Sequence, residues 1–397
     1  MKLMPINTDP KKINELLTRG VSEAIDLEHL KKSLTSGKKL RVKLGIDPTS
    51  PNLHLGRAVV LLKLRDFQEL GHQVVLIVGD FTGIIGDTSD KESERPMLSE
   101  QKVRENMKSY LKQAGMLLDL KRTELHYNSK WLKKLGYAEI GRQADKFSLS
   151  DFVSRENIKK RFAAGKRVSL RELLYPLMQG YDSVAVRADA ELGGTDQRFN
   201  LLAGRTLQAA YGQPPQDILM TNLISGTDGR KMSSSWGNTI NFLDSPADMF
   251  GKVMSLPDSQ MVSYFEHCTR IPMRQVDEFK KALTNSGTNP RDIKMNLAYE
   301  VTALFRGTSA AKKSRDEFIS VFQKKDLPED MPSIKFSGKN IIDTLVASKL
   351  ATSKSEARRL ILQKSIKIDG KVITSPDAVV EKGNVIQKGK RYFVKVI

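Results

Sequence analysis

Short apolar segments alternate with amphipathic helical segments through the first half of the chain, and this alternation restricts the possible fold more than any other feature. Residues 40–46 place apolar side chains at every second position, which is the period of a strand. Residues 59–70 have the apolar spacing of a helix, and Gly71 follows as a typical helix end. Residues 73–78 form a short apolar run, as expected of a buried parallel strand.

The same alternation continues beyond these segments. We expect a long polar helix after Ser99 and further strands at residues 184–186 and 218–223. This succession of strands and helices predicts an α/β fold, with a Rossmann-like parallel sheet that helices cover on both faces. Ligands of such sheets bind beyond the carboxyl ends of the strands. We therefore predict a ligand-binding domain over residues 1–243.

The pattern changes after residue 243. Ser245-Pro246 and Asn289-Pro290 each combine a capping side chain with a proline, which is typical of a helix start. The second pair begins an amphipathic helix that ends at Gly307 and carries an apolar stripe of Ile293, Leu297, Val301 and Leu304. No strand pattern occurs here, so we predict an all-helical domain over residues 244–325. A linker with two prolines is expected over residues 326–336.

Residues 337–397 are predicted to form a third, small α+β domain. Ser353 and Glu356 make a capping box at the start of a short helix, and Asp369-Gly370 is a hairpin signal between apolar residues. A second hairpin is expected at Lys388-Gly389. A pair of helices followed by basic hairpins resembles the alpha-L RNA-binding motif of ribosomal and RNA-modifying proteins. The alternative is a small dimerisation or capping module.

The charge distribution favours the RNA-binding interpretation of this tail. The chain carries a net charge of +19, and residues 337–397 hold 13 lysines and arginines against 5 acidic residues. Such a density of positive charge favours a polyanionic partner, because each neutralised phosphate releases condensed counterions. General solubility is the alternative explanation for the charge of the whole chain. We expect Arg358 and Arg359, on the predicted helix of the tail, to contact RNA.

The composition excludes several classes of protein. No apolar run approaches the roughly 20 residues that span a bilayer, and residues 1–19 lack the apolar block of a signal peptide. Cys268 is the only cysteine, which excludes an internal disulfide and a multi-cysteine metal site. The five histidines show no zinc-ligand spacing. We therefore expect a cytoplasmic protein that neither touches a membrane nor holds a structural metal.

Residues 47–57 are the first candidate binding segment, since they follow the strand at 40–46 and begin the next helix. A helix N-terminus just beyond a parallel strand is a natural phosphate site, because its amide hydrogens and its macrodipole both favour anions. His54 and Thr49 would donate to phosphate oxygens, and Gly56 would permit a close approach. The alternative is a turn in which His54 only caps the helix.

Residues 225–235 are the second candidate segment and follow the strand expected at 218–223. The segment combines glycine, hydroxyl and basic side chains, so it can move and can hold phosphates by charge-assisted hydrogen bonds. By itself it equally fits an exposed surface loop. The two weak signals in this order are stronger than either one alone.

These two segments carry a resemblance to a known family. The letters HLGR at 54–57 and KMSSS at 231–235 resemble the two signature sequences of class I aminoacyl-tRNA synthetases. Residues 175–182 and 193–197, together with Asp87, resemble the amino-acid pocket of the bacterial tyrosyl-tRNA synthetases. The resemblance extends over essentially the whole chain.

The resemblance implies both a domain assignment and a reaction. Residues 1–243 would form the catalytic domain with an insertion, residues 244–325 would recognise the anticodon, and residues 337–397 would bind RNA. The carboxylate of L-tyrosine would attack the α-phosphorus of ATP, with Mg²⁺ bound to the nucleotide, to give tyrosyl adenylate and pyrophosphate. The tyrosyl group would then pass to the 3′-terminal ribose of tRNA(Tyr). The family is dimeric, so a homodimer is expected by resemblance only.

Roles for individual residues also follow from the resemblance. The groups expected to act on the phosphates are Thr49, His54, Lys231, Ser233 and Ser234. The groups expected to bind tyrosine are Asp87, Tyr175, Gln179, Asp182 and Gln197, with Asp182 accepting from the phenol. The groups expected to bind ATP are Gly45, Asp47, Gly56, Arg57, Gly194, Asp196, Leu223, Ile224 and Arg230. Without the resemblance, Tyr175 would be interpreted as core packing and Asp196 as part of a solvated loop.

Three positions depart from the pattern of the family. Arg57 stands where the first signature has its second histidine, and it either touches ATP or points outward. Ser234 stands where the second signature commonly has a lysine, which places more weight on Lys231. Lys43 stands where many bacterial members have a tyrosine, so the resemblance supplies no phenol contact there.

Two other functions fit parts of the same pattern. A tryptophan enzyme of the same class would share both phosphate segments but would have no use for Asp182 beside a phenol. A catalytically retired RNA-binding paralogue is the second alternative, and Arg57 and Ser234 are the features that favour it.

Overall fold

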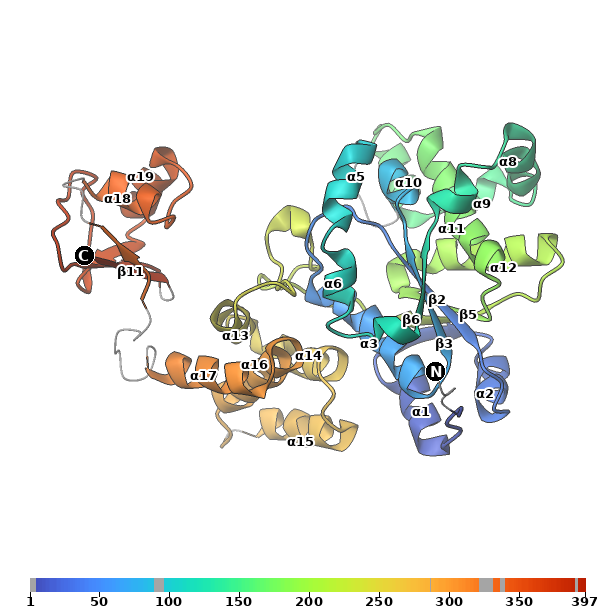
Figure 1. Cartoon of the computed structure of the whole chain (residues 1–397), viewed down its shortest axis with the longest axis horizontal. Coiled ribbons are helices and arrows are strands. Elements are labelled where there is room, and N and C mark those ends of the chain that lie inside the picture. Colours follow the sequence, from blue (N-terminus) through green and yellow to red (C-terminus); the bar gives the residue numbers. More distant parts are fainter. Residues whose placement is uncertain (1–4, 89–95, 286, 321–330, 336–339, 390–391) are drawn as a thin grey trace.

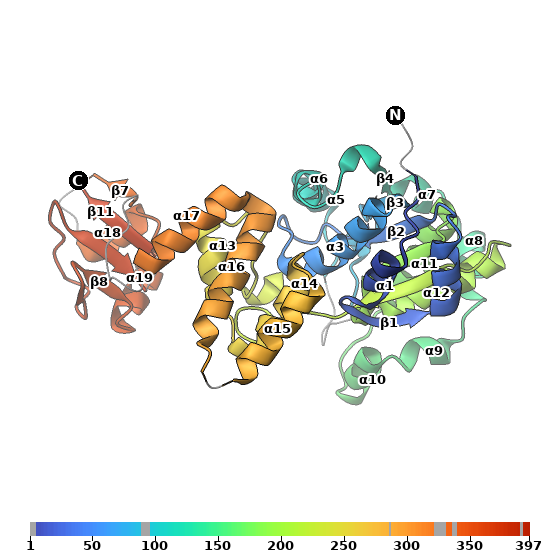
Figure 2. The same ribbon diagram turned by 90° about the horizontal axis from the view of Figure 1, so that it is seen from below.

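The computed structural model describes residues 5–88, 96–285, 287–320, 331–335, 340–389 and 392–397. Within these residues the chain forms two sheets and a group of helices between them (Figures 1 and 2). None of the helices in the described ranges is long and apolar enough to cross a membrane.

The first sheet has six strands in the order β1-β6-β5-β2-β3-β4. All neighbours are parallel except β1, which pairs antiparallel with β6 at the edge. The parallel Rossmann-like sheet predicted from the sequence is therefore confirmed. Its strands are β1 (Val21–Ile25), β2 (Arg41–Ile46), β3 (Gln73–Val78), β4 (Thr123–Tyr127), β5 (Ala190–Gly194) and β6 (Asp217–Thr221).

The strand order reverses between β2 and β5. From β2 the chain proceeds outward to β3 and β4, and it then returns to the other side of β2 to form β5 and β6. At such a switch point the connections leave in opposite directions, so a crevice opens beyond the carboxyl ends of the two strands. The residues that follow β2 and β5 are therefore placed beside one another.

Strand β2 shows how the sequence pattern becomes structure. The apolar side chains of residues 40–46 are buried as predicted. Lys43 is also buried, because a central parallel strand is covered on both faces. Gly45 is exposed, and a Cβ atom built on it would meet no atom within 4 Å. The strand therefore opens onto free space near its carboxyl end.

Twelve α-helices and two short 3₁₀ turns accompany the first sheet in the described residues up to position 210. The helix predicted to end at Gly71 is confirmed as α3, and Ser99 caps α5 as expected. Instead of the single long polar helix predicted after Ser99, the chain forms two short helices, α5 and α6, because the helix is interrupted between Met107 and Tyr110. The α-helices are α1 (Pro10–Thr18), α2 (Leu27–Thr35), α3 (Leu55–Glu69), α4 (Thr82–Ile85), α5 (Glu100–Met107), α6 (Tyr110–Ala114), α7 (Ser129–Leu132), α8 (Tyr137–Ala144), α9 (Leu149–Val153), α10 (Glu156–Ala163), α11 (Leu170–Val186) and α12 (Arg198–Ala210), and the short 3₁₀ turns are η1 (Leu120–Arg122) and η2 (Thr195–Gln197).

The strand predicted at residues 184–186 is wrong. These residues form the last turn of α11, which begins with a capping box of Ser169 and Glu172. A short apolar run cannot by itself be distinguished from a buried helix segment. The strand of this region is β5, which begins four residues later. It was not predicted because it ends in Gly193 and Gly194, which have no side chains and so give no hydrophobic pattern. Strands β1 and β4 were not predicted either.

The helices between the two sheets agree with the sequence prediction. Ser245 and Asn289 cap α13 and α16, each with proline in the first turn, and Gly307 ends α16 with a φ of 84°. No strand occurs within the described residues from 246 to 319. The helices of this part are α13 (Pro246–Met254), η4 (Asp258–Gln260), α14 (Met261–Cys268), α15 (Met273–Thr284), α16 (Pro290–Arg306) and α17 (Thr308–Ile319).

One continuous hydrophobic core joins these helices to the first sheet. Leu55 of α3, Phe242, Phe250 of α13 and Leu297 of α16 belong to the same cluster of buried side chains. The predicted boundary at 243/244 thus lies within a shared core, and it remains a prediction. Most of the predicted linker, residues 326–330 and 336, lies outside the described residues.

The tail has its own core and its own five-stranded sheet. The hairpin predicted at Asp369-Gly370 is confirmed, and both residues have positive φ, as a tight two-residue turn requires. The second hairpin is confirmed by the antiparallel pairing of β10 with β11. The elements are β7 (Ser333–Ile334), α18 (Ile341–Ala347), α19 (Lys354–Leu362), β8 (Ile366–Ile368), β9 (Lys371–Val372), β10 (Val385–Lys388) and β11 (Tyr392–Val396).

Candidate active site

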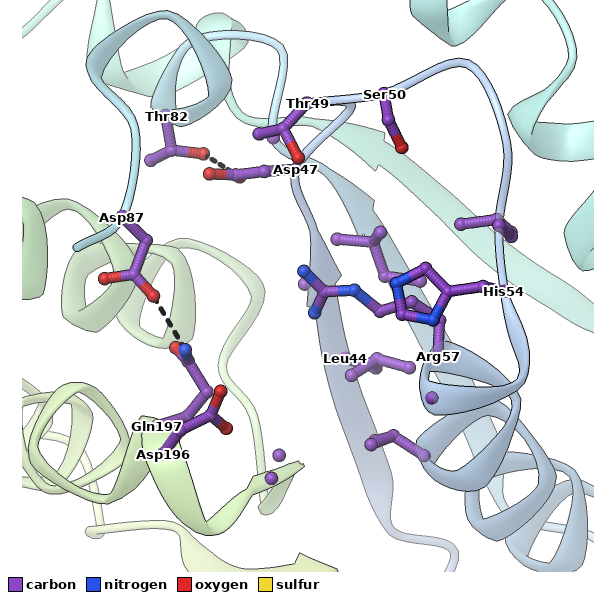
Figure 3. Close-up of a pocket in the computed structure, with 18 of the residues that line it drawn as sticks. Leu44, Asp47, Thr49, Ser50, His54, Arg57, Thr82, Asp87, Asp196 and Gln197 are labelled. Carbon is purple, nitrogen blue, oxygen red and sulfur yellow. Dashed lines mark hydrogen bonds between the residues drawn. The ribbon is translucent and has the colours of Figure 1, made fainter. Parts of the chain in front are cut away.

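A cavity of about 410 Å³ lies at the switch point, beyond the carboxyl ends of β2 and β5 (Figure 3). Every residue predicted from the resemblance to act on phosphates, to bind tyrosine or to bind ATP lines this cavity, except Arg230. The cavity thus brings together residues between positions 44 and 234 of the chain. Which of its lining residues binds which group remains a prediction.

The first signature segment is held by backbone pairing with a distant segment. The amide of Leu55 donates to the carbonyl of Ile240 at 2.9 Å, and the amide of Phe242 donates to the carbonyl of Leu53 at 2.9 Å. His54 stands at the N-cap position of α3, but its side chain makes no capping hydrogen bond. Its ring lines the cavity instead, so the interpretation of His54 as a mere helix cap is wrong.

The second signature segment touches the first one directly. The amide of Gly56 lies 3.3 Å from Sδ of Met232, although the two residues are 176 positions apart in the chain. Met232 is almost completely buried, and its amide donates to the carbonyl of Ile224 at 3.1 Å. The methionine of the second signature therefore anchors its loop against the N-terminus of α3.

Lys231 reaches across the cavity to the end of β5. Its Nζ lies 3.0 Å from Oδ2 of Asp196, and both side chains are partly exposed. The loop and the strand end are therefore connected by an ion pair that forms one wall of the cavity. An anion that entered beside Lys231 would compete with Asp196 for the ammonium group.

The three departures from the family pattern are placed by the structure. Arg57 extends from α3 into the cavity beside His54, so it does not point away from the site (Figure 3). Ser234 lines the cavity and begins the short turn η3 (Ser234–Trp236). The third departure, Lys43, is buried inside the sheet.

Arg230 is the one predicted ATP ligand that the structure does not bring into the cavity. Its Nε donates to Oδ2 of Asp228 at 2.8 Å, and its guanidinium lies 4.9 Å from the ring centre of Trp236. These two contacts hold the side chain on the outer side of the loop.

One end of the cavity carries two carboxylates, Asp47 and Asp87, that are held in place by hydrogen bonds. Asp47 accepts from the hydroxyl of Thr82 at 2.7 Å, and Gln197 donates to Asp87 at 2.7 Å (Figure 3). Asp47 also accepts from the phenol of Tyr175 at 2.8 Å. Burial raises the pKa of Asp47 to about 6, although both hydrogen bonds oppose this shift. This end offers negative charge to a bound cation.

Asp182 occupies the floor of the cavity. Trp131 Nε1 donates to Oδ1 at 2.7 Å and Asn128 Nδ2 donates to Oδ2 at 3.2 Å. Burial raises the pKa of Asp182 to about 7, against the lowering effect of nearby Lys43 and of these two donors. Sequence reasoning missed both donors. They follow β4, so a prediction of that strand would have placed them at the cavity.

Lys43 belongs to a buried polar cluster beneath the cavity. Its Nζ lies 2.9 Å from Oε1 of Glu191 and donates to the Ser183 hydroxyl at 2.7 Å. It also donates to the backbone carbonyl of Gln179 at 3.0 Å, while the Gln179 side chain donates to Glu191 at 3.1 Å. Lys43 therefore supports Gln179 from below and does not line the cavity.

Arg358 and Arg359, the predicted RNA contacts, lie on α19 in the tail. Both are exposed, and they follow the cap in which the Ser353 hydroxyl accepts from the Glu356 amide at 3.1 Å. The structure therefore leaves these two side chains accessible to a partner.

Comparison with known proteins gives two family matches. Residues 35–323 match the model of the class I tRNA synthetases (W and Y). Residues 323–396 match the model of the tyrosine–tRNA ligase SYY-like C-terminal domain. The two matches together cover nearly the whole chain.

Individual relatives agree with these matches. The chain is 47% identical to a tyrosine–tRNA ligase of Thermotoga maritima over 98% of both chains. It is 46% identical to one of Moorella thermoacetica, over 96% of this chain and 94% of the relative. Among solved structures, a tyrosyl-tRNA synthetase from Archaeoglobus fulgidus complexed with L-tyrosine matches with a TM-score of 0.61 at 22% identity, covering 77% of this chain and 99% of the other. That likeness concerns the fold alone.

Removing the ammonium group of Lys43 should destabilise the sheet. Lys43→Met leaves the carboxylate of Glu191 buried without its cation, and we expect a loss of about 3–5 kcal/mol in the free energy of unfolding. Urea unfolding followed by tryptophan fluorescence measures it. Lys38→Met is the matched control, because it breaks an exposed ion pair with Asp189 in the same region and should cost about 1 kcal/mol or less. Equal losses in the two variants would contradict the role of the buried cluster.

Proposed function

The chain belongs to the tyrosine–tRNA ligases of the class I aminoacyl-tRNA synthetases, and from that premise we propose that it activates L-tyrosine with ATP and transfers the tyrosyl group to tRNA(Tyr). The observation that carries the proposal is the shared cavity. Both phosphate segments and the acidic pocket line it together.

Activation needs no nucleophile from the protein. The carboxylate of tyrosine attacks the α-phosphorus of ATP, the bond to the bridging oxygen breaks, and pyrophosphate leaves with the electron pair. The chain therefore contributes positioning and stabilisation of the charge that develops on the departing phosphates. His54 and Thr49 on the side of α3 and Lys231 with Ser233 on the loop are the groups proposed for this role.

Lys231 has to change partner during this step. In the structure its ammonium group is held by Asp196, the proposed ribose contact at the end of β5. We propose that the ribose hydroxyls take over Asp196 when ATP binds, so that Lys231 becomes available to the phosphates. Because charge on the phosphates grows as pyrophosphate leaves, the new contact stabilises the transition state more than bound ATP.

The amino-acid pocket supports tyrosine as the substrate. The carboxylates Asp87 and Asp47 offer negative charge for its ammonium group, and Asp182 offers an acceptor for its phenol. Both oxygens of Asp182 already accept from Trp131 and Asn128, which fixes the carboxylate as an acceptor. Phenylalanine would leave this buried acceptor without its third donor, which costs binding energy.

Magnesium is proposed to enter with the nucleotide. The described residues contain no group of three or more acidic, histidine or cysteine side chains that could hold a metal ion. The carboxylates of the cavity also have partners of their own, such as Lys231 for Asp196. The residues present therefore fit an ion coordinated mainly by the phosphates, as is common for Mg²⁺.

Two partners complete the proposal. The basic tail, with Arg358 and Arg359 exposed on α19, is proposed to bind the transfer RNA, and the reaction is proposed to take place in the cytoplasm. A homodimer is proposed from the resemblance to the family, and large apolar side chains of α9 to α11 are exposed and available for contact. Leu149 of α9, Phe162 of α10 and Leu170 of α11 are 66%, 51% and 78% exposed. Contact between two copies over these side chains would remove apolar surface from water.

The proposed function is tested by ATP–pyrophosphate exchange with each amino acid in turn. We expect exchange that depends on tyrosine, with tryptophan and phenylalanine at least about a hundred-fold less effective because neither satisfies Asp182. Equal or greater stimulation by tryptophan would overturn the substrate assignment. Binding of transfer RNA without any tyrosine-dependent exchange would favour a catalytically retired paralogue.

Tyrosine affinity should increase with pH as Asp182 loses its proton. Its pKa lies near 7 in the free protein, and the phenol prefers the carboxylate as acceptor, so binding of tyrosine lowers this pKa. Affinity should therefore rise about four-fold from pH 6.5 to pH 8.5, an interval above the pKa of Asp47. Equilibrium dialysis measures it. Asp182→Asn should bind tyrosine with no such trend, and an equal trend in this variant would contradict the assignment.

Removing the two exposed arginines of α19 should weaken the use of transfer RNA only. In Arg358→Ala/Arg359→Ala, tyrosine-dependent exchange should be unchanged, while aminoacylation at low transfer RNA concentration falls. The salt dependence of the transfer RNA affinity should decrease by about 1–2 in log–log slope, because fewer counterions are released. The matched control is Lys31→Ala/Lys32→Ala on α2, which removes two exposed cations away from the tail. Identical slopes in both double variants would contradict the tail assignment.

A further inference from the structure

Asn238 lies just outside the second signature and is almost completely buried beneath its loop. The residue is only 3% exposed. Its Oδ1 accepts from the amide of Ser233 at 2.9 Å, and its Nδ2 donates to the carbonyl of Lys231 at 3.1 Å. The same Nδ2 donates to Oδ1 of Asp228 at 2.8 Å. One carboxamide thus forms hydrogen bonds with three separate residues of the loop.

Backbone contacts of Asn238 add to these side-chain hydrogen bonds. Its carbonyl accepts from the amide of Thr227 at 3.0 Å, so the start and the end of the loop are joined. Gly226 packs directly on the carboxamide, because a Cβ atom at this position would lie 2.4 Å from Cγ of Asn238. The loop therefore closes around Asn238 in one conformation, and Gly226 leaves the space that this requires.

The chemistry of the contacts demands an amide. Two acceptors and one donor of the loop face the side chain, and only a carboxamide presents two donors and an acceptor at that spacing. The hydrogen bond from Asn238 is also the largest reason why the pKa of Asp228 is lowered to about 2. An aspartate at 238 would face Asp228 and the Lys231 carbonyl with negative charge and no donor.

We propose that Asn238 is a positioning residue for adenylate formation, which holds the backbone of Lys231 and Ser233 so that both side chains face the cavity. The inference rests on the proposed function, because it concerns the step in which Lys231 exchanges Asp196 for the phosphates. The contacts of Asn238 are present before any such exchange, so they order this backbone in advance. A fixed backbone lets Lys231 reach the phosphates without first ordering the loop.

The test compares variants at this position with a matched amide elsewhere. Asn238→Ala removes the three hydrogen bonds, and Asn238→Asp replaces the donating amide nitrogen with a carboxylate oxygen that can only accept. Gly226→Ala, in case the first variants fail to fold, displaces Asn238 by a second route, since the added Cβ atom meets both its carboxamide and its backbone carbonyl. Gln68 on α3 is the control, because its side chain is also 3% exposed, donates to Asp119 and Thr123, and accepts from the Asp119 amide. Gln68→Ala and Gln68→Glu make the same chemical changes away from the cavity.

Single-turnover formation of tyrosyl adenylate, tyrosine affinity and melting temperature are measured for the full-length chain. We expect Asn238→Ala and Gly226→Ala to slow adenylate formation by about 10- to 100-fold with tyrosine affinity within about two-fold, since a small displacement of a positioned group has effects of this size. Asn238→Asp should be at least as slow. The Gln68 variants should lose comparable thermal stability but keep the rate of adenylate formation.

A double-variant cycle shows whether Asn238 acts through Lys231. Lys231→Ala alone should slow adenylate formation strongly, and adding Asn238→Ala to it should cost less than about three-fold more, because the positioned group is already absent. The inference would be overturned if the two substitutions together reduced the rate of adenylate formation by the product of their separate effects. It would also be overturned if the Asn238 variants behaved like the Gln68 variants. A wild-type chain without tyrosine-dependent exchange would contradict the proposed function instead, so the two failures are distinguishable.

Discussion

The cavity depends on a backbone pairing between two segments that are far apart in the chain. Residues 53–55 and 240–242 exchange hydrogen bonds between Leu55 and Ile240 and between Phe242 and Leu53. Met232 adds a contact to the amide of Gly56, and the surrounding side chains belong to one core shared by the sheet and the helices that follow it. Because these bonds are buried, the two signature segments cannot separate without exposing unsatisfied polar groups. The position of His54, which we propose to contact the phosphates, follows from this pairing.

Charge within the cavity is divided between two ends. The acidic end is kept in place by hydrogen bonds, such as those from Tyr175 to Asp47 and from Trp131 to Asp182. The other end carries Lys231, which is held on its loop by Asp196 and which we propose to change partner when ATP binds. A rigid pocket suits recognition of the amino acid, whereas a movable cation suits a charge that appears only during the reaction. Asn238 allows both a positioned loop and a movable cation, since it restrains the backbone of the loop and leaves the side chain of Lys231 able to move.

The sequence allowed the prediction of several elements that depend on local periodicity, and its motifs directed attention to the residues around the cavity. The strand at 40–46, the helix ending at Gly71 and the hairpin at Asp369-Gly370 are encoded by neighbouring residues, and the structure confirms them. Strand β5 escaped prediction because its glycines carry no hydrophobic signal, and α11 was taken for a strand at its last turn. Trp131 and Asn238 escaped because their partners lie far along the chain or in an irregular loop, where no period exists. Arg230 lies outside the cavity lining, which the motif could not show because a sequence motif does not give the direction of a side chain.

The most direct test of the account is a structure of the protein with L-tyrosine and a non-hydrolysable ATP analogue. We expect the triphosphate to lie between His54 and Lys231, with Lys231 no longer paired with Asp196 and the phenol oxygen within hydrogen-bond distance of Asp182. A nucleotide bound elsewhere, or phosphates in the cavity while Lys231 stays paired with Asp196, would contradict it.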